Sequence, residues 1–160
     1  MRSWIRAWIR AMAVVPLFLV GPAELAGQDE EGALAAVERI FEGMREADAA
    51  KVRDVFAQDA RFAMLDDRQA PTGVTVRDVG GWLDAIGASG GAWDERTYDV
   101  VVHVDGAMAS VWAPYTFYLE GTISHCGINS IELLHDGNGW KVTQISDTRR
   151  SEGCPDPLRG

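Results

Sequence analysis

The stretch Ala107-Met-Ala-Ser-Val-Trp-Ala-Pro-Tyr-Thr-Phe-Tyr-Leu-Glu120 decides the fold of this chain. It is rich in β-branched and aromatic residues, which favour extended strands, and it ends at Gly121. Two more such runs follow at 122–135 and 140–149, joined by the hairpin signal Asp136-Gly-Asn-Gly139. The second half of the sequence therefore predicts a meander of long antiparallel strands.

Two helices are predicted ahead of these strands. Apolar residues recur every three or four positions between Glu31 and Ala47, which is the pattern of an amphipathic helix. Asp48 is a suitable N-cap for a second, short helix. Apolar and polar residues then alternate at 60–65, which predicts a single strand.

A third helix is predicted from Thr75 to Gly87. The Thr75 hydroxyl would cap it with Asp78 as the capping-box partner, and glycine is a common residue at helix ends. A further strand is predicted at 97–104. Because the helices are separated along the chain from the antiparallel strands, the predicted fold class is α+β.

Residues 1–27 have the three-part pattern of a secretory signal peptide. Three arginines precede an uncharged apolar run at 11–20, and mostly small residues follow up to Gly27. The run is shorter than the roughly 20 residues that a bilayer-spanning helix needs. We expect cleavage near Ala26 or Gly27, export to the periplasm or out of the cell, and no stable membrane anchor after processing; a retained anchor is the alternative.

Length and composition indicate one globular domain, which we place at 28–154, followed by a C-terminal tail at 155–160. Of the 160 residues, 47% are hydrophobic and 24% charged, which excludes collagen, coiled coils and disordered tails. The chain carries 15 basic and 24 acidic residues, a net charge of −9. We expect no nucleic-acid partner, because phosphate backbones are held by clustered Lys and Arg.

Three motifs resemble a known superfamily: 111–121 (VWAPYTFYLEG), 124–129 (SHCGIN), and Gly139-Trp-Lys together with Asp147-Thr-Arg-Arg150. They are similar to exported bacterial members of the nuclear transport factor 2-like superfamily, SnoaL-like proteins labelled putative lumazine-binding. The resemblance covers about 31–154. It implies a cone-shaped, cystatin-like roll, a curved antiparallel sheet wrapped around N-terminal helices, with a pocket at the open end and frequent dimerisation through the sheet.

Strand alternation indicates which residues face this pocket. Glu120 and Glu132 mark the outer face of their strands, so residues of the other parity point toward the helices. His125 and Asn129 are then polar groups on an otherwise apolar inner face, where they either satisfy one another or meet a ligand. The predicted ligand-binding residues are Phe62, Trp82, Tyr115, Phe117, His125 and Asn129.

Asp147 and His125 are the candidates for proton transfer. Asp147 could act as a general base if burial raised its pKa, or it could simply pair with Arg149 or Arg150. Val142 and Ile145 have opposite parity, so either one of them faces solvent or a β-bulge lies between them. The direction of the Asp147 and Arg149 side chains therefore stays open.

Other site chemistries do not fit the spacing of the residues. His125 and Cys126 are adjacent on a strand and point to opposite faces, so they cannot easily bind one metal ion or act as a nucleophile–base pair. Neither a zinc-type ligand spacing nor a Gly-x-Ser-x-Gly elbow occurs. We expect neither a metal nor a cofactor.

A disulfide between Cys126 and Cys154 is the one pairing that two cysteines permit in an oxidising compartment. Pairing His135 with Trp140 places Cys126 opposite Arg149, which leaves Cys154 about 16 Å too far along a straight strand. That exceeds the reach of a disulfide, roughly 7 Å between Cα atoms. Only a chain reversal at 151–153 would close the bond, and both outcomes stay open.

The outer face of 107–120 would carry Trp112, Thr116 and Tyr118. Nothing obvious in the chain covers this aromatic strip, and exposed patches of this kind usually mark interfaces. We expect a homodimer through this face.

These observations predict an exported protein that binds a small molecule, of aromatic character, in the open end of the roll. Non-enzymatic binding is favoured because the sequence contains no nucleophile–base or metal-ligand spacing. Two alternatives stay open. One is an isomerase- or cyclase-like enzyme that uses Asp147 or His125; the other is a structural or assembly module with a vestigial pocket.

Overall fold

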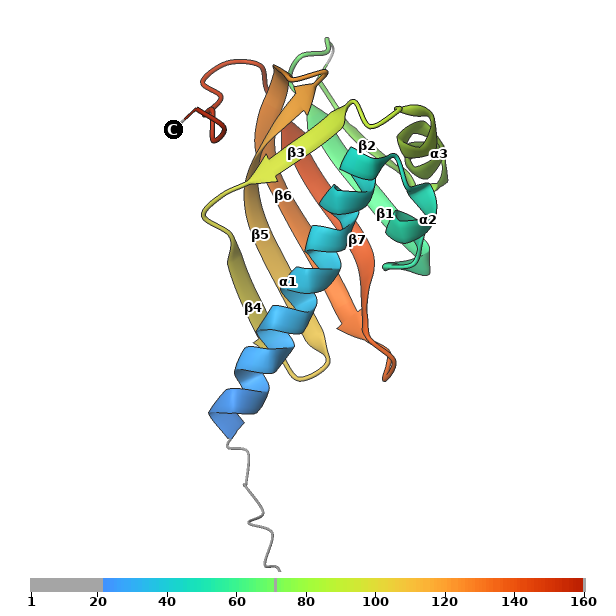
Figure 1. Ribbon diagram of the computed structural model, residues 1–160, viewed down its shortest axis with the longest axis vertical. Coiled ribbons are helices and arrows are strands. Elements are labelled where there is room, and N and C mark those ends of the chain that lie inside the picture. The colour runs from blue at the N-terminus through green and yellow to red at the C-terminus, as the bar shows by residue number, and fades with distance from the viewer. Residues whose placement is uncertain (1–21, 71, 160) are drawn as a thin grey trace, which may run out of the picture.

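Helices cover one face of a curved sheet, as the ribbon of the computed structural model shows (Figure 1). The structure describes residues 22–70 and 72–159. The α+β class and the cystatin-like roll are confirmed. The helices are α1 (Pro22–Glu46), α2 (Ala49–Arg53) and α3 (Gly80–Ala88), and the strands are β1 (Phe56–Asp66), β2 (Val74–Asp78), β3 (Trp93–Thr97), β4 (Val101–Asp105), β5 (Met108–Leu119), β6 (Thr122–His135) and β7 (Trp140–Arg149).

The sheet is mixed rather than wholly antiparallel. Its strand order is β2-β1-β7-β6-β5-β3, and β4 pairs with β5 as well. The long β5–β6–β7 meander is antiparallel as predicted, whereas β1 runs parallel to β7. No hairpin joins β1 to β7, because β2, α3 and the strands β3 to β6 lie between them in the sequence, so the two strands are free to run parallel.

The amphipathic pattern of the first helix is confirmed. Along α1 the buried side chains include Val37, Ile40 and Met44, and they pack into the core that α1 shares with the sheet. The helix starts at Pro22, inside the predicted leader, and residues 1–21 lie outside the described part. Asp48 caps α2 as predicted, since its carboxylate accepts hydrogen bonds from two backbone N–H groups at 2.9 and 3.0 Å. No helix in the described part combines the length and the hydropathy that a membrane crossing requires.

The helix predicted to begin at Thr75 is wrong in its first turn. Residues 74–78 form the edge strand β2, in which Thr75 pairs with Met64 of β1. The β-branched sequence Val74-Thr-Val76 suits an edge strand, and pairing with β1 decides the local structure. The helix α3 starts only at Gly80, whose N–H donates to Asp78 Oδ1 at 2.8 Å.

The strand predicted at 97–104 is divided in two. The backbone breaks at 98–100, where Asp99 has a φ of 48°. Both halves, β3 and β4, pair with β5. Because β3 begins at Trp93, it brings Glu95 into the sheet, beside Phe117.

Two bulges set the directions of the side chains in β6 and β7. Glu132 pairs with Gln144 but Leu133 pairs with Val142, so Thr143 is the extra residue. Val142 and Ile145 are consequently both buried. The alternative with a bulge is therefore the one the structure adopts.

Because Asp147 and Arg149 share the face of Ile145, they too point into the molecule.

A second bulge, between Phe117 and Tyr118, has the same kind of effect on β6: Phe117 pairs with His125, and Tyr118 pairs with Ile123. Ser124 is the extra residue, and it faces inward with His125 instead of outward as alternation predicted.

The disulfide between Cys126 and Cys154 is present, with the Cα atoms 5.4 Å apart. Cys126 pairs with Arg150 rather than Arg149, because the bulge at Thr143 shifts the register by one residue. The chain then reverses before Cys154, and Gly153 adopts a positive φ of 64° there.

The C-terminal segment, residues 154–159, packs on the outer face of the sheet. Thr116 Oγ1 donates to the carbonyl of Pro155 at 2.9 Å, and the Tyr118 hydroxyl donates to Asp156 Oδ1 at 2.7 Å. The predicted exposed strip is therefore wrong for Thr116 and Tyr118, which this segment covers. Trp112 remains 51% exposed.

Candidate functional site

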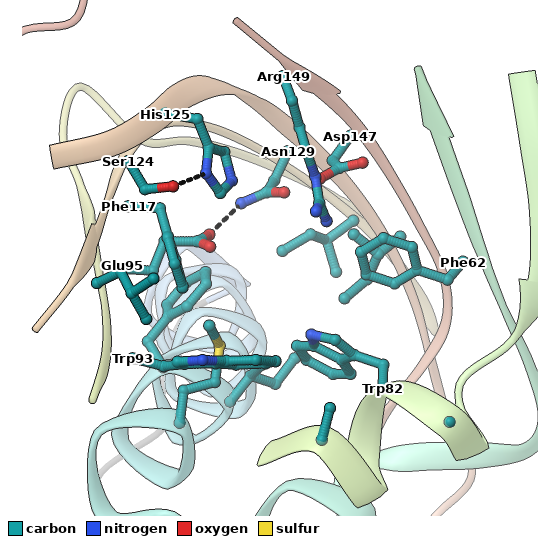
Figure 2. Close-up of a pocket in the computed structure, with 18 of the residues that line it drawn as sticks. Phe62, Trp82, Trp93, Glu95, Phe117, Ser124, His125, Asn129, Asp147 and Arg149 are labelled. Carbon is teal, nitrogen blue, oxygen red and sulfur yellow. Dashed lines mark hydrogen bonds and ion pairs between the residues drawn. The ribbon is translucent and has the colours of Figure 1, made fainter. Parts of the chain in front are cut away.

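A cavity of about 380 Å³ lies between the concave face of the sheet, α1 and α3 (Figure 2). Its apolar lining includes Phe62 of β1, Trp82 of α3, Trp93 of β3 and Phe117 of β5. Its polar lining is Arg68, Arg77, Glu95, Ser124, His125, Asn129, Asp147 and Arg149.

Aromatic rings form two walls of this cavity. Trp82 lies 5.5 Å from Phe62, centroid to centroid, at an interplanar angle of 35°. A second aromatic pair is formed by Trp93 and Phe117, whose rings meet edge-on at 5.9 Å. Figure 2 shows the Trp82 and Trp93 rings on the same side of the cavity, opposite the polar side chains of β6 and β7. Flat apolar molecules pack well against such walls.

Glu95 and Asn129 form the central polar contact. Asn129 Nδ2 donates to Glu95 Oε1 at 2.7 Å. Burial raises the pKa of Glu95 to about 7, and the negative charge of Asp147 adds to this, whereas the hydrogen bond from Asn129 and the charge of Arg149 oppose it. Glu95 can therefore donate or accept a proton near neutral pH.

His125 is held as a neutral ring. It stacks on Phe117 at 4.8 Å, and its Nδ1 lies 3.2 Å from Ser124 Oγ. Burial lowers the pKa of His125 to about 4, and the positive charges of Arg68 and Arg149 add to the effect. His125 and Asn129 bind different partners, so they do not satisfy one another.

Asp147 forms an ion pair and also lines the cavity. Arg149 Nε donates to Asp147 Oδ2 at 2.7 Å, so the predicted ion pair exists. The carboxylate also lines the cavity, and burial raises its pKa although Arg149 opposes the rise. Its second oxygen, Oδ1, is buried and has no hydrogen-bond partner among the described residues.

A second ion pair lies beside the first on the parallel strand β1. Arg68 binds Asp66 through two nitrogens, Nε and Nη2, each at 2.7 Å. These bonds hold the pKa of Asp66 well below its usual range. Two guanidinium groups lie near Phe62: the Cζ atoms of Arg77 and Arg149 are each 5.9 Å from its ring centroid.

Five of the six predicted ligand-binding residues line the cavity: Phe62, Trp82, Phe117, His125 and Asn129. Tyr115 lies outside the lining. Its hydroxyl donates to the carbonyl of Thr148 at 3.0 Å. The cross-strand partner of Tyr115 is Gly127, and the Thr148 carbonyl occupies the space that a side chain at Gly127 would need.

Sequence reasoning missed Glu95, Arg68, Arg77 and Ser124. The segment around Glu95 is highly charged, although the alternation of Trp93, Glu95 and Thr97 against Asp94 and Arg96 was a signal for a strand. Arg96 and Asp94 do pair with each other away from the cavity, at 2.9 Å. Within the described residues, no group of three His, Cys, Asp or Glu side chains is placed to hold a metal ion.

The cavity can therefore surround a small flat molecule. Its walls exclude water from the faces of a ring, while Glu95, Asn129, His125 and Asp147 offer hydrogen-bonding groups at one side. Because the carboxyl of Glu95 titrates near neutrality, the same group could exchange a proton with a bound molecule.

Comparison with known proteins agrees with this architecture. A family model described as putative lumazine-binding matches residues 28–119. No curated protein matches the chain. Among solved structures, a protein of unknown function from Mycobacterium tuberculosis superimposes with a TM-score of 0.65 at 16% identity, covering 83% of this chain and 78% of that one.

Two other structures are similar. A nuclear transport factor 2-like protein with a cystatin-like fold from Novosphingobium aromaticivorans has a TM-score of 0.63 at 14% identity, covering 84% of this chain and 92% of that one. A putative dehydratase of the same superfamily from Streptomyces avermitilis has a TM-score of 0.60 at 15% identity, covering 78% and 98%. The chain thus belongs to the putative lumazine-binding family, and its fold is that of nuclear transport factor 2-like proteins.

Proposed function

We propose that this protein is an exported binding protein for a small aromatic molecule. The observation that carries the proposal is the cavity of about 380 Å³, which has aromatic rings on two sides and a few convergent polar groups. Binding sites for small molecules typically have this volume and composition. The family description, putative lumazine-binding, supports a heteroaromatic ligand.

The polar groups would fix the orientation of such a ligand. The oxygens of Glu95 and Asp147 and the ring nitrogens of His125 lie on the side opposite Trp82 and Trp93. A heteroaromatic ring has both acceptor nitrogens and N–H donors at its edge. A carboxyl group that is half protonated near pH 7 can bond to either kind.

The test is a titration of the purified protein with lumazine, a pterin and a flavin, in which calorimetry and tryptophan fluorescence measure the binding. We expect saturable binding that weakens about tenfold in Asn129→Leu and in His125→Ala, as lost polar and stacking contacts would predict. Gln144→Ala, an exposed change on β7, is the matched control and should bind normally. If no member of the panel binds, the proposal fails and the assembly module is favoured.

A second candidate function is acid–base catalysis, which the carboxyl of Glu95 favours. Its pKa of about 7 is the value a general acid or base needs at neutral pH. Asp147 and His125, the groups expected from the sequence, fit less well. Arg149 binds the carboxylate of Asp147, and the lowered pKa of His125 makes its ring a weak base. An enzyme would lose turnover in Glu95→Gln while it still bound the substrate; unchanged turnover would exclude this role.

Export is part of the proposal. The Cys126–Cys154 disulfide supports it, because such bonds persist in oxidising compartments. N-terminal sequencing of protein recovered from the extracytoplasmic fraction should find a new N-terminus near Ala26 or Gly27. An intact Met1 on protein in the cytosol would contradict export.

We also propose that copies of the chain associate through the outer face of the sheet around Trp112. Its exposed indole borders a shallow apolar depression with Ile128 and Ser130. Sedimentation should show a dimer that Trp112→Glu dissociates. A wild-type monomer at micromolar concentration would contradict this arrangement.

A further inference from the structure

We infer that the ligand carries an anionic group, held by Arg149 and Arg77 at the end of the cavity next to Phe62. This inference rests on the proposed function and adds the charge of the ligand to it. Its basis is a set of three arginines lining the cavity of an otherwise acidic protein, one of which has no acidic partner in the described structure.

Arg149 has donors to spare. Its Nε bonds to Asp147 Oδ2, but no described residue accepts a hydrogen bond from its two terminal nitrogens. The side chain points down into the cavity (Figure 2). The guanidinium group is planar, and its paired N–H groups match the two oxygens of a carboxylate or a phosphate.

Arg77 approaches the same ring from the edge strand. It is the cross-strand partner of Phe62, and its Cζ lies as far from the ring centroid as that of Arg149 does, 5.9 Å. No ion pair involves Arg77 within the described structure, whereas Arg68 is bound by both oxygens of Asp66. Arg77 therefore supplies the positive charge that the carboxylates nearby do not offset.

The carboxyl groups in and beside the cavity leave this excess positive charge in place. Asp147 is shared with Arg149, and Asp66 is enclosed by its bonds to Arg68 and Gln69. Glu95 bonds to Asn129 rather than to an arginine. An anion bound near Phe62 would therefore meet positive charge that no described carboxylate offsets.

Entry of a ligand also favours an anionic group. A ring that fills the space between Trp82 and Phe117 removes water from the terminal nitrogens of Arg149. A charged donor that loses water without gaining an acceptor is costly. A neutral apolar ligand would carry that cost, whereas an aromatic acid supplies the acceptor. The ligand class we infer is a flat aromatic ring with a carboxylate or an equivalent oxyanion.

The test compares two probes of equal size, 2-naphthoate and 2-naphthamide, by calorimetry at neutral pH. The wild type should bind the acid about tenfold more tightly than the amide, and added salt should reduce this preference. Arg77→Gln should remove much of the preference while the affinity for the amide stays the same. Arg149→Lys keeps the positive charge beside Asp147 but loses the paired N–H groups of the guanidinium group, and it should weaken binding of the acid.

Arg61→Gln is the matched control, because Arg61 is an exposed arginine of the same strand as Phe62 but on the opposite face. It should leave both affinities unchanged. Equal affinity of the wild type for both probes, or a preference that survives in both Arg77→Gln and Arg149→Lys, overturns the inference but leaves the proposed function standing. If neither probe binds and the heteroaromatic panel also fails, the proposed function falls with the inference.

Discussion

Glu95 occupies an unusual position for a carboxyl group. It lies in the cavity wall, and its hydrogen bond comes from the neutral amide of Asn129 rather than from an arginine. In the unfolded chain the pKa of Glu95 returns to about 4.5. Between that value and about 7 the folded protein holds a proton that the unfolded chain has released, so stability falls as the pH rises through this range.

The first prediction concerns this proton. Glu95→Gln replaces the titrating carboxyl group by a neutral amide. The difference in free energy of unfolding between the variant and the wild type should therefore shift in favour of the variant from pH 4.5 to pH 7, by at most about 3 kcal/mol. Urea denaturation followed by circular dichroism at several pH values measures the difference. The exposed change Glu38→Gln is the control. A wild type and a Glu95→Gln variant with parallel pH profiles would contradict the raised pKa.

Gly127 shows how close the backbones of β6 and β7 come. A Cβ on this residue would overlap the carbonyl of Thr148, which also accepts the hydrogen bond from Tyr115. We therefore predict that Gly127→Ala lowers the free energy of unfolding by about 3 kcal/mol, as overpacked sites do. Gly81→Ala is the comparison, because no atom lies near its Cβ. A Gly127→Ala protein as stable as the wild type would show that the strands can separate.

At the scale of elements, the long strands and α1 could be predicted because each has a clear hydrophobic period. The same period placed His125 and Asn129 on the inner face correctly. Asp147 could not be placed, because a bulge adds one residue to β7 and reverses the parity. The parity of Val142 and Ile145 allowed such a bulge, but only the pairing with β6 shows that it forms.

The clearest error of the sequence analysis was to predict a helix where the structure has the edge strand β2. Val76, Val79, Leu83 and Ile86 also fit a helical spacing, and the Thr75–Asp78 pair fits a capping box. Only the pairing with β1 separates the two structures, and the helical spacing of the apolar residues gives no sign of that pairing. Glu95 was not predicted as a cavity residue for a related reason: β3 is recognised as a strand through its pairing with β5.

The corrected boundary leads to a prediction for α3. Asp78→Ala removes the acceptor of the Gly80 N–H and should cost about 1 kcal/mol of stability, as for a lost cap. Thr75→Ala lies in an exposed strand and should change stability by less than about 0.5 kcal/mol. Thermal or urea unfolding compares them. A larger loss in Thr75→Ala would support the helix predicted from the sequence.

At the scale of the whole molecule, the sequence alone could not decide whether the disulfide forms. The bond depends on a one-residue shift of register and on the chain reversal at Gly153, and neither can be read from the local sequence. The bond closes a loop between residues 28 positions apart. Reduction should lower the free energy of unfolding by about 3 to 4 kcal/mol in the chain-entropy account. Denaturation with and without reductant measures this, and thiol titration in denaturant should find none free before reduction. Two reactive thiols at that stage would contradict the bond.

The same bond changes how the molecule would carry a mechanical load. A force applied to the C-terminus passes at Cys154 directly into Cys126, in the interior strand β6, and bypasses β7. The strand that lies last in the sequence would not be the first to peel away. In a stretching experiment the loop stays closed, so full extension should be shorter by roughly 90 Å than for the reduced chain, at about 3.3 Å per residue.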